Sequence, residues 1–263
     1  MKKALFSGAV ALLMAASAFH AHAETPEEKG LAIAKEQKAR DQGWGDSQSE
    51  MEMILRTPNG KEYTRFIKVK SLEVQTDGDK SLMVFEEPKD VEGTAFLSFS
   101  HVNEPDDQWI YLPALKRIKR IASKKKSGSF MGSEFSYEDL SSFEIAKYDF
   151  KYLRDEELDG KKCFVVESYP KDEYSGYTRL VSWIDQDEYR SYKVEFYDRK
   201  QSLLKTMTVQ EYLQLDGKFW RPVKSLMENH QTGKSTELRW NNIRLNTGLK
   251  DEDFSQNNLK RAD

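Results

Sequence analysis

From Ser47 onward the chain is dominated by short runs in which apolar and polar positions alternate. In the first run Met51, Met53 and Leu55 share one face, because successive side chains of a strand point to opposite faces. Similar runs, rich in aromatic and β-branched residues, cover 63–69, 82–85, 96–99, 109–112, 163–169, 177–184, 192–197, 203–215, 219–227 and 236–245. The pattern predicts a mostly β protein with about eleven or twelve strands.

Four turn signals separate these runs and predict how the strands pair. They are Asn59-Gly60, Asp77-Gly78, Asp159-Gly160 and Asp216-Gly217. Such dipeptides favour tight hairpins, and strands joined by tight turns pair antiparallel. A single sheet of this many strands has to curl, and a curled sheet of more than about eight strands leaves space inside. A two-sheet sandwich with a filled core fits the same apolar pattern equally well.

Two segments depart from the strand pattern. Thr25 provides an N-cap and Glu28 completes a capping box, so a helix is predicted over 26–40. In the middle of the chain a strongly basic stretch, 115–126, is followed by a loop and then by residues that favour a short helix, 136–143. We therefore expect an N-terminal helix and a short helical insertion between the strands.

The first residues have the features of a secretion signal. Lys2 and Lys3 precede an uncharged apolar run over 5–19, and Ala21-His22-Ala23 gives the small-x-small pattern of a cleavage site. The run is shorter than the ~20 residues that a membrane-spanning helix needs. We expect residues 1–23 to be a cleaved signal peptide and 24–263 to form a single exported domain. An uncleaved N-terminal anchor is the alternative.

Charge and cysteine content restrict the partners only weakly. The sequence contains 41 Lys+Arg and 44 Asp+Glu, and without Lys2 and Lys3 there are 39 cations against 44 anions, a net charge of −5. An exported protein of this mild acidity is not expected to bind nucleic acid. Cys163 is the only cysteine, so an intramolecular disulfide is impossible and a buried, inert thiol is expected.

The sequence lacks the motifs of the common catalytic and cofactor sites. The expected mature chain has two histidines, His101 and His230, and no zinc-ligand spacing, Walker loop, dinucleotide fingerprint or Gly-x-Ser-x-Gly. Acidic pairs such as Asp106-Asp107 fall between strands, where solvated turn residues are common. We expect no enzyme, no cofactor and no metal site. An envelope hydrolase that uses two carboxylates is the rival hypothesis.

Five segments of the chain resemble one known family. They are GTAFL at 93–97, WIYLPALKR at 109–117, SFMGSEFSYEDL at 129–140, WID at 183–185 and LKDEDF at 249–254. On these segments the chain resembles the LolA-like family, whose members are outer-membrane lipoprotein-sorting proteins. The stretch at 129–140 is the most specific part, and the resemblance covers nearly the whole expected mature chain.

The resemblance implies an incomplete, strongly curved antiparallel β-barrel whose apolar concave face is covered by helices that act as a lid. It further implies a periplasmic carrier that binds the acyl chains of a lipid or lipoprotein and shuttles them between an inner-membrane exporter and the outer membrane. This branch of the family often accompanies exporters of the RND type. A monomer is expected, with peripheral membrane contact at most.

Candidate site residues follow from the apolar runs and from the resemblance. Candidates for the lipid-binding wall are Met51, Met53, Leu55, Ile67, Val69, Leu82, Val84, Phe96, Trp109 and Tyr111. Candidates for the lid are Phe130, Met131, Phe135 and Phe143. Arg65 is a candidate for the arginine that locks the lid in LolA, although no motif assigns it.

The basic segment has three possible roles. Candidates for contact with lipid headgroups or a partner are Arg65, Lys116, Arg117, Lys119 and Arg120. An alternative to the carrier is a non-transporting accessory subunit that docks on an RND-type exporter through 116–126. The third possibility is a solvated hairpin edge that lysines protect from pairing.

Overall fold

The structure is a computed structural model that describes residues 24–260. The predicted signal peptide, 1–23, lies outside the described residues. Thirteen strands form one antiparallel sheet, one or two more than predicted. They are β1 (Asp46–Arg56), β2 (Glu62–Leu72), β3 (Lys80–Glu87), β4 (Ala95–Phe99), β5 (Asp107–Leu112), β6 (Arg117–Arg120), β7 (Tyr148–Leu158), β8 (Lys161–Pro170), β9 (Tyr177–Asp185), β10 (Ser191–Asp198), β11 (Leu203–Leu215), β12 (Phe219–Asn229) and β13 (Ser235–Leu245).

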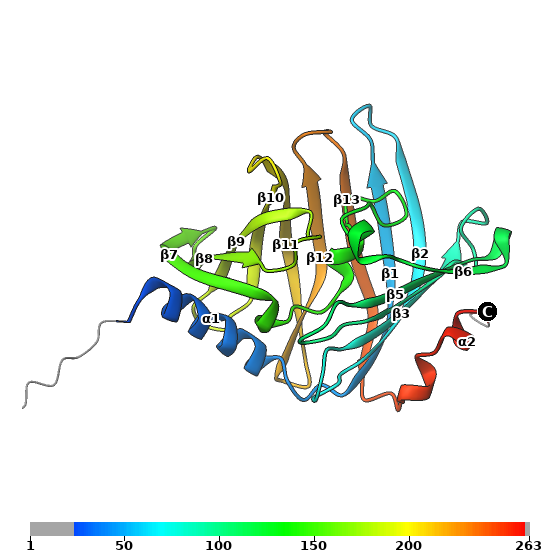
Figure 1. Ribbon diagram of the computed structural model, residues 1–263, viewed down its shortest axis with the longest axis horizontal. Helices are drawn as coiled ribbons and strands as arrows, with labels where there is room; N and C mark the ends of the chain where they lie inside the picture. Colours follow the sequence, from blue (N-terminus) through cyan, green and yellow to red (C-terminus); the bar gives the residue numbers. More distant parts are fainter. Residues whose placement is uncertain (1–23, 261–263) are drawn as a thin grey trace, which may run out of the picture.

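The sheet is strongly curved and does not close. Its strand order is β6-β5-β4-β3-β2-β1-β13-β12-β11-β10-β9-β8-β7, so β6 and β7 are the two edges (Figure 1). All four predicted turns lie between strands that pair with each other. The prediction of an incomplete antiparallel barrel is therefore confirmed, and the two-sheet sandwich is wrong because every strand belongs to one sheet.

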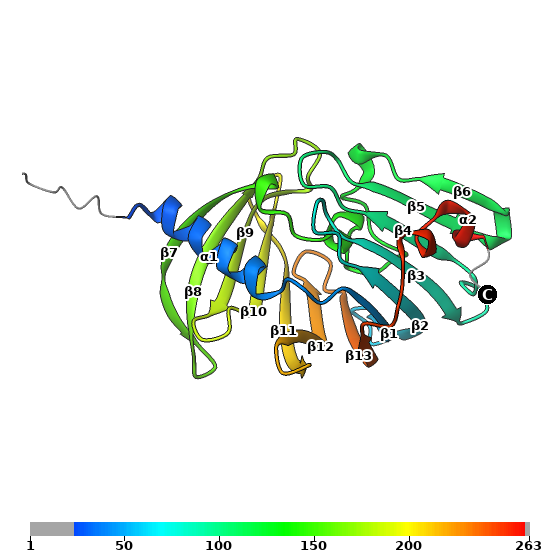
Figure 2. The same cartoon turned by 90° about the horizontal axis from the view of Figure 1, so that it is seen from below.

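The segment that joins the two edge strands crosses the concave side of the sheet. We call residues 121–147 the lid (Figures 1 and 2). The predicted helical insertion consists of short 3-10 turns: η1 (Pro113–Leu115) before β6, then η2 (Ser123–Lys125), η3 (Tyr137–Leu140) and η4 (Ile145–Lys147). Since β6 and β7 are consecutive in sequence but lie at opposite edges, their connection has to span the open side of the barrel.

The N-terminal helix α1 (Pro26–Arg40) forms where the capping residues predict it. The Thr25 hydroxyl accepts a hydrogen bond from the Glu28 amide at 3.1 Å, and the Glu28 carboxylate accepts one from the Thr25 amide at 2.8 Å. Ile33 and Ala34 are buried against the concave side of β7, β8 and β9. The helix therefore covers the end of the sheet that the lid leaves free (Figure 2).

Gly30 allows α1 to touch the backbone of β7. A Cβ atom at this position would lie 2.7 Å from the Tyr152 amide nitrogen and 2.9 Å from two backbone atoms of Lys151. Glycine-to-alanine changes inside an exposed helix normally stabilise by about 1 kcal/mol. We predict that Gly30→Ala instead lowers the free energy of unfolding by about 1–3 kcal/mol, because α1 has to move off the strand. Chemical denaturation measures this, and a stabilised variant would contradict the packing described.

Both faces of the sheet are apolar over β2–β5. The concave side belongs to the main core, and the convex side is covered by the C-terminal segment, which contains η5 (Asp251–Asp253) and α2 (Gln256–Leu259). Phe254 and Leu259 are buried there against Leu82, Ala95 and Leu97. No helix among residues 24–260 combines the length and the apolar character needed to cross a bilayer.

Candidate functional site

The concave face forms a continuous apolar surface because the strand register aligns its side chains. Met51 on β1 lies opposite Ile67 on β2 and opposite Trp240 on β13. On the other side of β13, Met207 on β11 lies opposite Met227 on β12. All five side chains belong to, or pack against, one cluster of buried residues. The hollow side of the sheet is therefore the main core of the protein.

The lid fills the part of this hollow that faces β1–β5. Phe130 is completely buried, and its ring centroid lies 5.1 Å from that of Phe96, 5.8 Å from that of Phe85 and 5.6 Å from that of Tyr137. Phe135, at the other end of the same loop, is also buried in this cluster. In this half of the barrel the interior is occupied by side chains of the lid.

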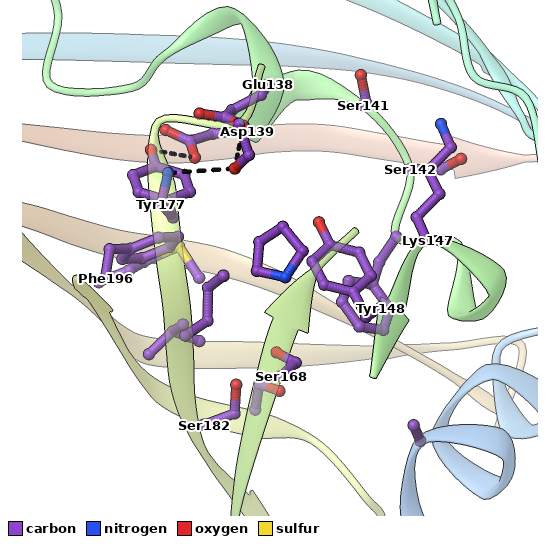
Figure 3. Close-up of a pocket in the computed structure, with 18 of the residues that line it drawn as sticks. Glu138, Asp139, Ser141, Ser142, Lys147, Tyr148, Ser168, Tyr177, Ser182 and Phe196 are labelled. Carbon is purple, nitrogen blue, oxygen red and sulfur yellow. Dashed lines mark hydrogen bonds between the residues drawn. The ribbon is translucent and has the colours of Figure 1, made fainter. Parts of the chain in front are cut away.

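The other half of the hollow contains a cavity of about 520 Å³ between α1, the lid and strands β8–β12. Its floor is lined by Ser168, Leu180, Ser182, Val194, Phe196, Met207 and Met227 (Figure 3). Val194 lies opposite both Ser182 and Met207 in the sheet, so the floor is continuous across three strands. Small serines among larger apolar side chains leave the space that the cavity occupies.

The mouth of the cavity is polar and charged. Its lining there includes Lys38, Asp79, Asp106, Lys126, Glu138, Lys147 and Asp172. Lys126 pairs with Asp172 at 2.5 Å, and Lys147 pairs with Asp106. An apolar floor below a charged mouth suits an amphiphile, whose hydrocarbon is buried while its polar end stays near water.

A buried ion pair holds the lid to the strands beside the cavity. The Lys205 ammonium on β11 lies 2.5 Å from the Asp139 carboxylate, and these side chains are only 4% and 7% exposed. The same carboxylate accepts a hydrogen bond from the Tyr177 hydroxyl at 2.8 Å. We call these three residues the latch. Next to it, Glu138 accepts a hydrogen bond from the Gly176 amide at 2.8 Å, and burial raises the pKa of its carboxyl.

Arg65 holds the lid at its opposite end. Its guanidinium, half-buried on β2, donates a hydrogen bond to the Met131 carbonyl of the lid and lies 5.9 Å from the centroid of the Phe85 ring. Burial lowers the pKa of this guanidinium. The Glu134 amide also donates a hydrogen bond to the Thr236 hydroxyl on β13 at 3.0 Å. Polar contacts therefore fix the lid to both halves of the sheet.

Two aspartates in the β2–β3 turn have pKa values shifted in opposite directions. Burial raises the pKa of Asp79 to about 6, with the neighbouring Glu144 and Glu73 adding to the effect. The pKa of Asp77 falls to about 2 because its carboxylate accepts hydrogen bonds from the His101 ring, at 2.6 Å, and from the Val102 amide. Asp79 is thus ionised at neutral pH at a cost in stability, whereas ionised Asp77 is stabilising.

We predict opposite effects of neutralising these two carboxyls. The folded-state pKa of Asp79 lies above its unfolded value of 3.8, so its ionisation makes the protein less stable as pH rises from about 4 to about 6. Asp79→Asn should therefore raise the free energy of unfolding at pH 7 by about 1–3 kcal/mol and have no effect below about pH 4. Asp77→Asn should lower stability above about pH 4. Denaturant titrations at pH 4 and pH 7 measure the change for Asp79→Asn, and titrations at pH 2 and pH 5 measure the change for Asp77→Asn. An equal effect of either variant at its two pH values would contradict the assignment.

The structure places the wall candidates on two different faces. Six are concave: Met51, Met53, Leu55, Ile67, Val69 and Phe96. Four are convex, in the cluster covered by the C-terminal segment: Leu82, Val84, Trp109 and Tyr111. Because side chains alternate along a strand, a pick displaced by one residue selects the opposite face. None of the ten lines the cavity beside α1.

The remaining candidates lie in the lid and on its approach. Phe130 and Met131 pack into the core, while Phe135 and Phe143 line the cavity. Lys116, Arg117, Lys119 and Arg120 are exposed at the β5–β6 hairpin, away from the cavity, and Arg120 pairs with Asp107. Sequence reasoning missed the floor residues on β8–β12. The signal available was that Leu180 and Ser182, two residues apart, share one face of a predicted strand.

The described residues offer no site for a metal ion. Across 24–260, no group of three or more His, Cys, Asp or Glu side chains is arranged to hold one. Cys163 is buried on the convex side, where burial raises the pKa of its thiol. An open, curved sheet with a lidded, partly apolar cavity instead defines a half-barrel with room for a ligand.

Comparison with known proteins assigns this half-barrel to a family. A family model described only as that of an uncharacterized protein matches residues 77–261. A crystal structure from Vibrio parahaemolyticus, described provisionally as an outer membrane lipoprotein-sorting protein domain, is 58% identical, with a TM-score of 0.88. The match covers 89% of this chain and 100% of that one. Among curated proteins, none matches the chain.

Two further crystal structures share the fold of this chain. A DUF1329 family protein from Desulfovibrio piger is 32% identical, covers 89% of this chain and 99% of its own, and has a TM-score of 0.85. A LolA superfamily protein from Nitrosomonas europaea is 22% identical, covers 87% and 98%, and has a TM-score of 0.70. The chain belongs to the same family as the outer membrane lipoprotein-sorting domain from Vibrio parahaemolyticus, and it has a LolA-like fold, as its sequence motifs predict. This fold is one of binding and transport rather than of an enzyme family.

Proposed function

We propose that this protein is a periplasmic carrier that takes the acyl chains of a lipid or lipoprotein into the cavity between α1 and the lid. It shuttles this cargo between an inner-membrane exporter and the outer membrane. The observation that supports the proposal most strongly is the cavity itself, with its apolar floor and charged mouth. The sorting role is taken from the 58% identical relative, whose description names outer membrane lipoprotein sorting. The periplasmic location is taken from the signal peptide that the sequence predicts over 1–23.

The energetics of hydrocarbon in water explain why such a carrier is needed. Each buried methylene contributes ~0.8 kcal/mol, so an acyl chain of about sixteen carbons would cost on the order of 12 kcal/mol to hold bare in water. A cavity of about 520 Å³ falls within the roughly 300–1,000 Å³ of typical small-molecule sites. Leu180, Val194 and Met207 supply the apolar surface that replaces the membrane interior.

Loading and release follow from the way the lid is held. The lid is held by polar contacts, among them those of Arg65 and the latch, and by the packing of Phe130. A movement of the lid would break these contacts but none of the strand pairs that form the sheet. A larger cargo would displace the lid from the half of the hollow that Phe130 fills. Transfer to an acceptor of higher affinity then needs no energy source in the carrier.

A non-transporting accessory subunit, docked through 116–126, is the alternative. It would give a role to the exposed cations of that segment but none to the cavity, the lid or the latch. The carrier accounts for more of the described residues, and we therefore prefer it.

Native mass spectrometry of the protein purified from envelope extract tests the proposal. We expect a bound acyl lipid, and transfer of that lipid to acceptor vesicles on incubation. A protein that leaves the envelope without lipid and transfers none would contradict the carrier function.

A further inference from the structure

A strongly basic surface lies outside the cavity, at the hairpin between β5 and β6. We call residues 113–125 the basic hairpin. Five of its cations are exposed and form no ion pair with any of residues 24–260: Lys116, Arg117, Lys119, Lys124 and Lys125. Arg120, also exposed, pairs with Asp107. Uncompensated positive charge is therefore concentrated around β6, one edge of the sheet. Figure 2 shows where β6 lies.

An apolar side chain projects from the same hairpin. Leu115 is 53% exposed at the end of η1, directly before Lys116, whose positive φ of 46° makes the turn into β6. An exposed leucine followed directly by two cations is a combination found where proteins insert shallowly at a membrane surface. Protection of a sheet edge from pairing would explain the lysines but not the leucine.

The rest of the molecule has the opposite net charge to the basic hairpin, which would orient the protein at an anionic surface. The whole chain has a formal net charge of −3, so a basic hairpin with five unpaired cations leaves the remainder more acidic still. An anionic bilayer would attract the hairpin and repel the other faces, and would so orient the protein with β6 towards the membrane.

The basic hairpin overlaps the first residues of the lid, 121–125. Residue 121 follows β6, and Ile121 and Ser123 line a second cavity of about 300 Å³. That cavity shares Lys126 and Lys147 with the main one. Contact of the hairpin with a bilayer would therefore hold one end of the lid, and the approach to the main cavity, next to the lipid.

We propose that the basic hairpin docks on the surface of an anionic phospholipid bilayer. The charge complementarity and the exposed Leu115 favour a lipid surface over an acidic protein, since a protein partner would not require an apolar tip. This docking goes beyond the carrier function and does not depend on cargo in the cavity.

Vesicle flotation tests the docking. The wild-type protein should bind vesicles of phosphatidylcholine with phosphatidylglycerol, should ignore vesicles of phosphatidylcholine alone, and should be released by salt. A cation near an anionic surface contributes about fivefold to partitioning, so the triple variant Lys116→Glu, Arg117→Glu, Lys119→Glu should bind at least about 100-fold more weakly. Leu115→Ser should weaken binding severalfold while leaving the salt dependence unchanged.

A matched variant controls for net charge. Lys61, Lys200 and Lys234 are exposed in the β1–β2, β10–β11 and β12–β13 turns, and form no ion pair with any of residues 24–260. Their replacement by glutamate changes the charge equally and should reduce vesicle binding by far less. Equal losses in the two triple variants, or a wild-type protein that fails to bind anionic vesicles, would overturn the docking. So would binding only to vesicles that contain envelope proteins.

Different experimental results would overturn the docking and the carrier function. Lipid found in the cavity of a protein that ignores anionic vesicles would overturn the docking alone. An empty cavity in a protein that binds those vesicles would overturn the carrier alone. Near-identical unfolding midpoints of both triple variants and the wild type establish that the charge changes leave the fold intact.

Discussion

Replacing Lys205 with methionine should lower the free energy of unfolding by about 3–5 kcal/mol and release the lid. The substitution leaves the Asp139 carboxylate buried without its cation, and an unpaired buried charge is among the most destabilising changes that a protein can suffer. The Tyr177 hydroxyl, which donates to the same carboxylate, cannot replace a full charge. Denaturant unfolding measures the loss, and hydrogen exchange over 134–140 reports on the release of the lid.

Two comparisons isolate the latch. The double variant Lys205→Met with Asp139→Leu removes both charges and should recover at least about 2 kcal/mol relative to the sum of the single changes. Lys68→Met breaks the exposed pair of Lys68 on β2 with Glu86 on β3, whose side chains are 58% and 41% exposed, and should cost less than about 1 kcal/mol. If Lys205→Met costs no more than Lys68→Met, the latch does not hold the lid.

Replacing Ser182 with tryptophan should abolish the binding of acyl chains. Ser182 lies on the cavity floor between Leu180 and Val194, so an indole there would occupy the space left by the small side chain. Excluding four or more methylenes at ~0.8 kcal/mol each weakens binding by about 100-fold or more. Titration with a fluorescent palmitate analogue measures the change.

Thr208→Trp is the matched control for the cavity. Thr208 is partly exposed on β11 and points to the convex face, because its neighbour Met207 lines the cavity. This variant should bind the palmitate analogue as the wild type does. Equal affinity in the Ser182→Trp and Thr208→Trp variants would place the ligand elsewhere.

The sequence predicts eleven of the thirteen strands as separate runs, and the two that it omits are the edges. β6 contains Arg117, Lys119 and Arg120 in four residues, and β7 ends in the acidic run 155–157. Edge strands carry charge because exposed apolar edges would pair with other chains, so the apolar alternation that reveals a strand is weakest there. The capping residues of α1 and the four turns are local signals, and the sequence predicts them correctly.

The cavity is harder to predict than the fold. On β3 and β5 both faces are apolar, because the C-terminal segment covers the convex side, so alternation cannot tell Leu82 from Met83. Which part of the hollow stays open depends on where Phe130 packs, and this long-range contact leaves no local pattern. The exposed basic hairpin, by contrast, can be predicted from the run of lysines and arginines in the sequence.

The central claim is that hydrocarbon lodges on the concave floor beneath the lid. A photo-crosslinking amino acid placed at Met207 or at Thr208, neighbours that face opposite sides of β11, tests it most directly. After illumination in cells grown with a labelled fatty acid, the protein with the crosslinker at Met207 should carry the label and the one at Thr208 should not. Equal labelling at both positions, or label at Thr208 alone, would contradict a carrier that binds its cargo inside the barrel.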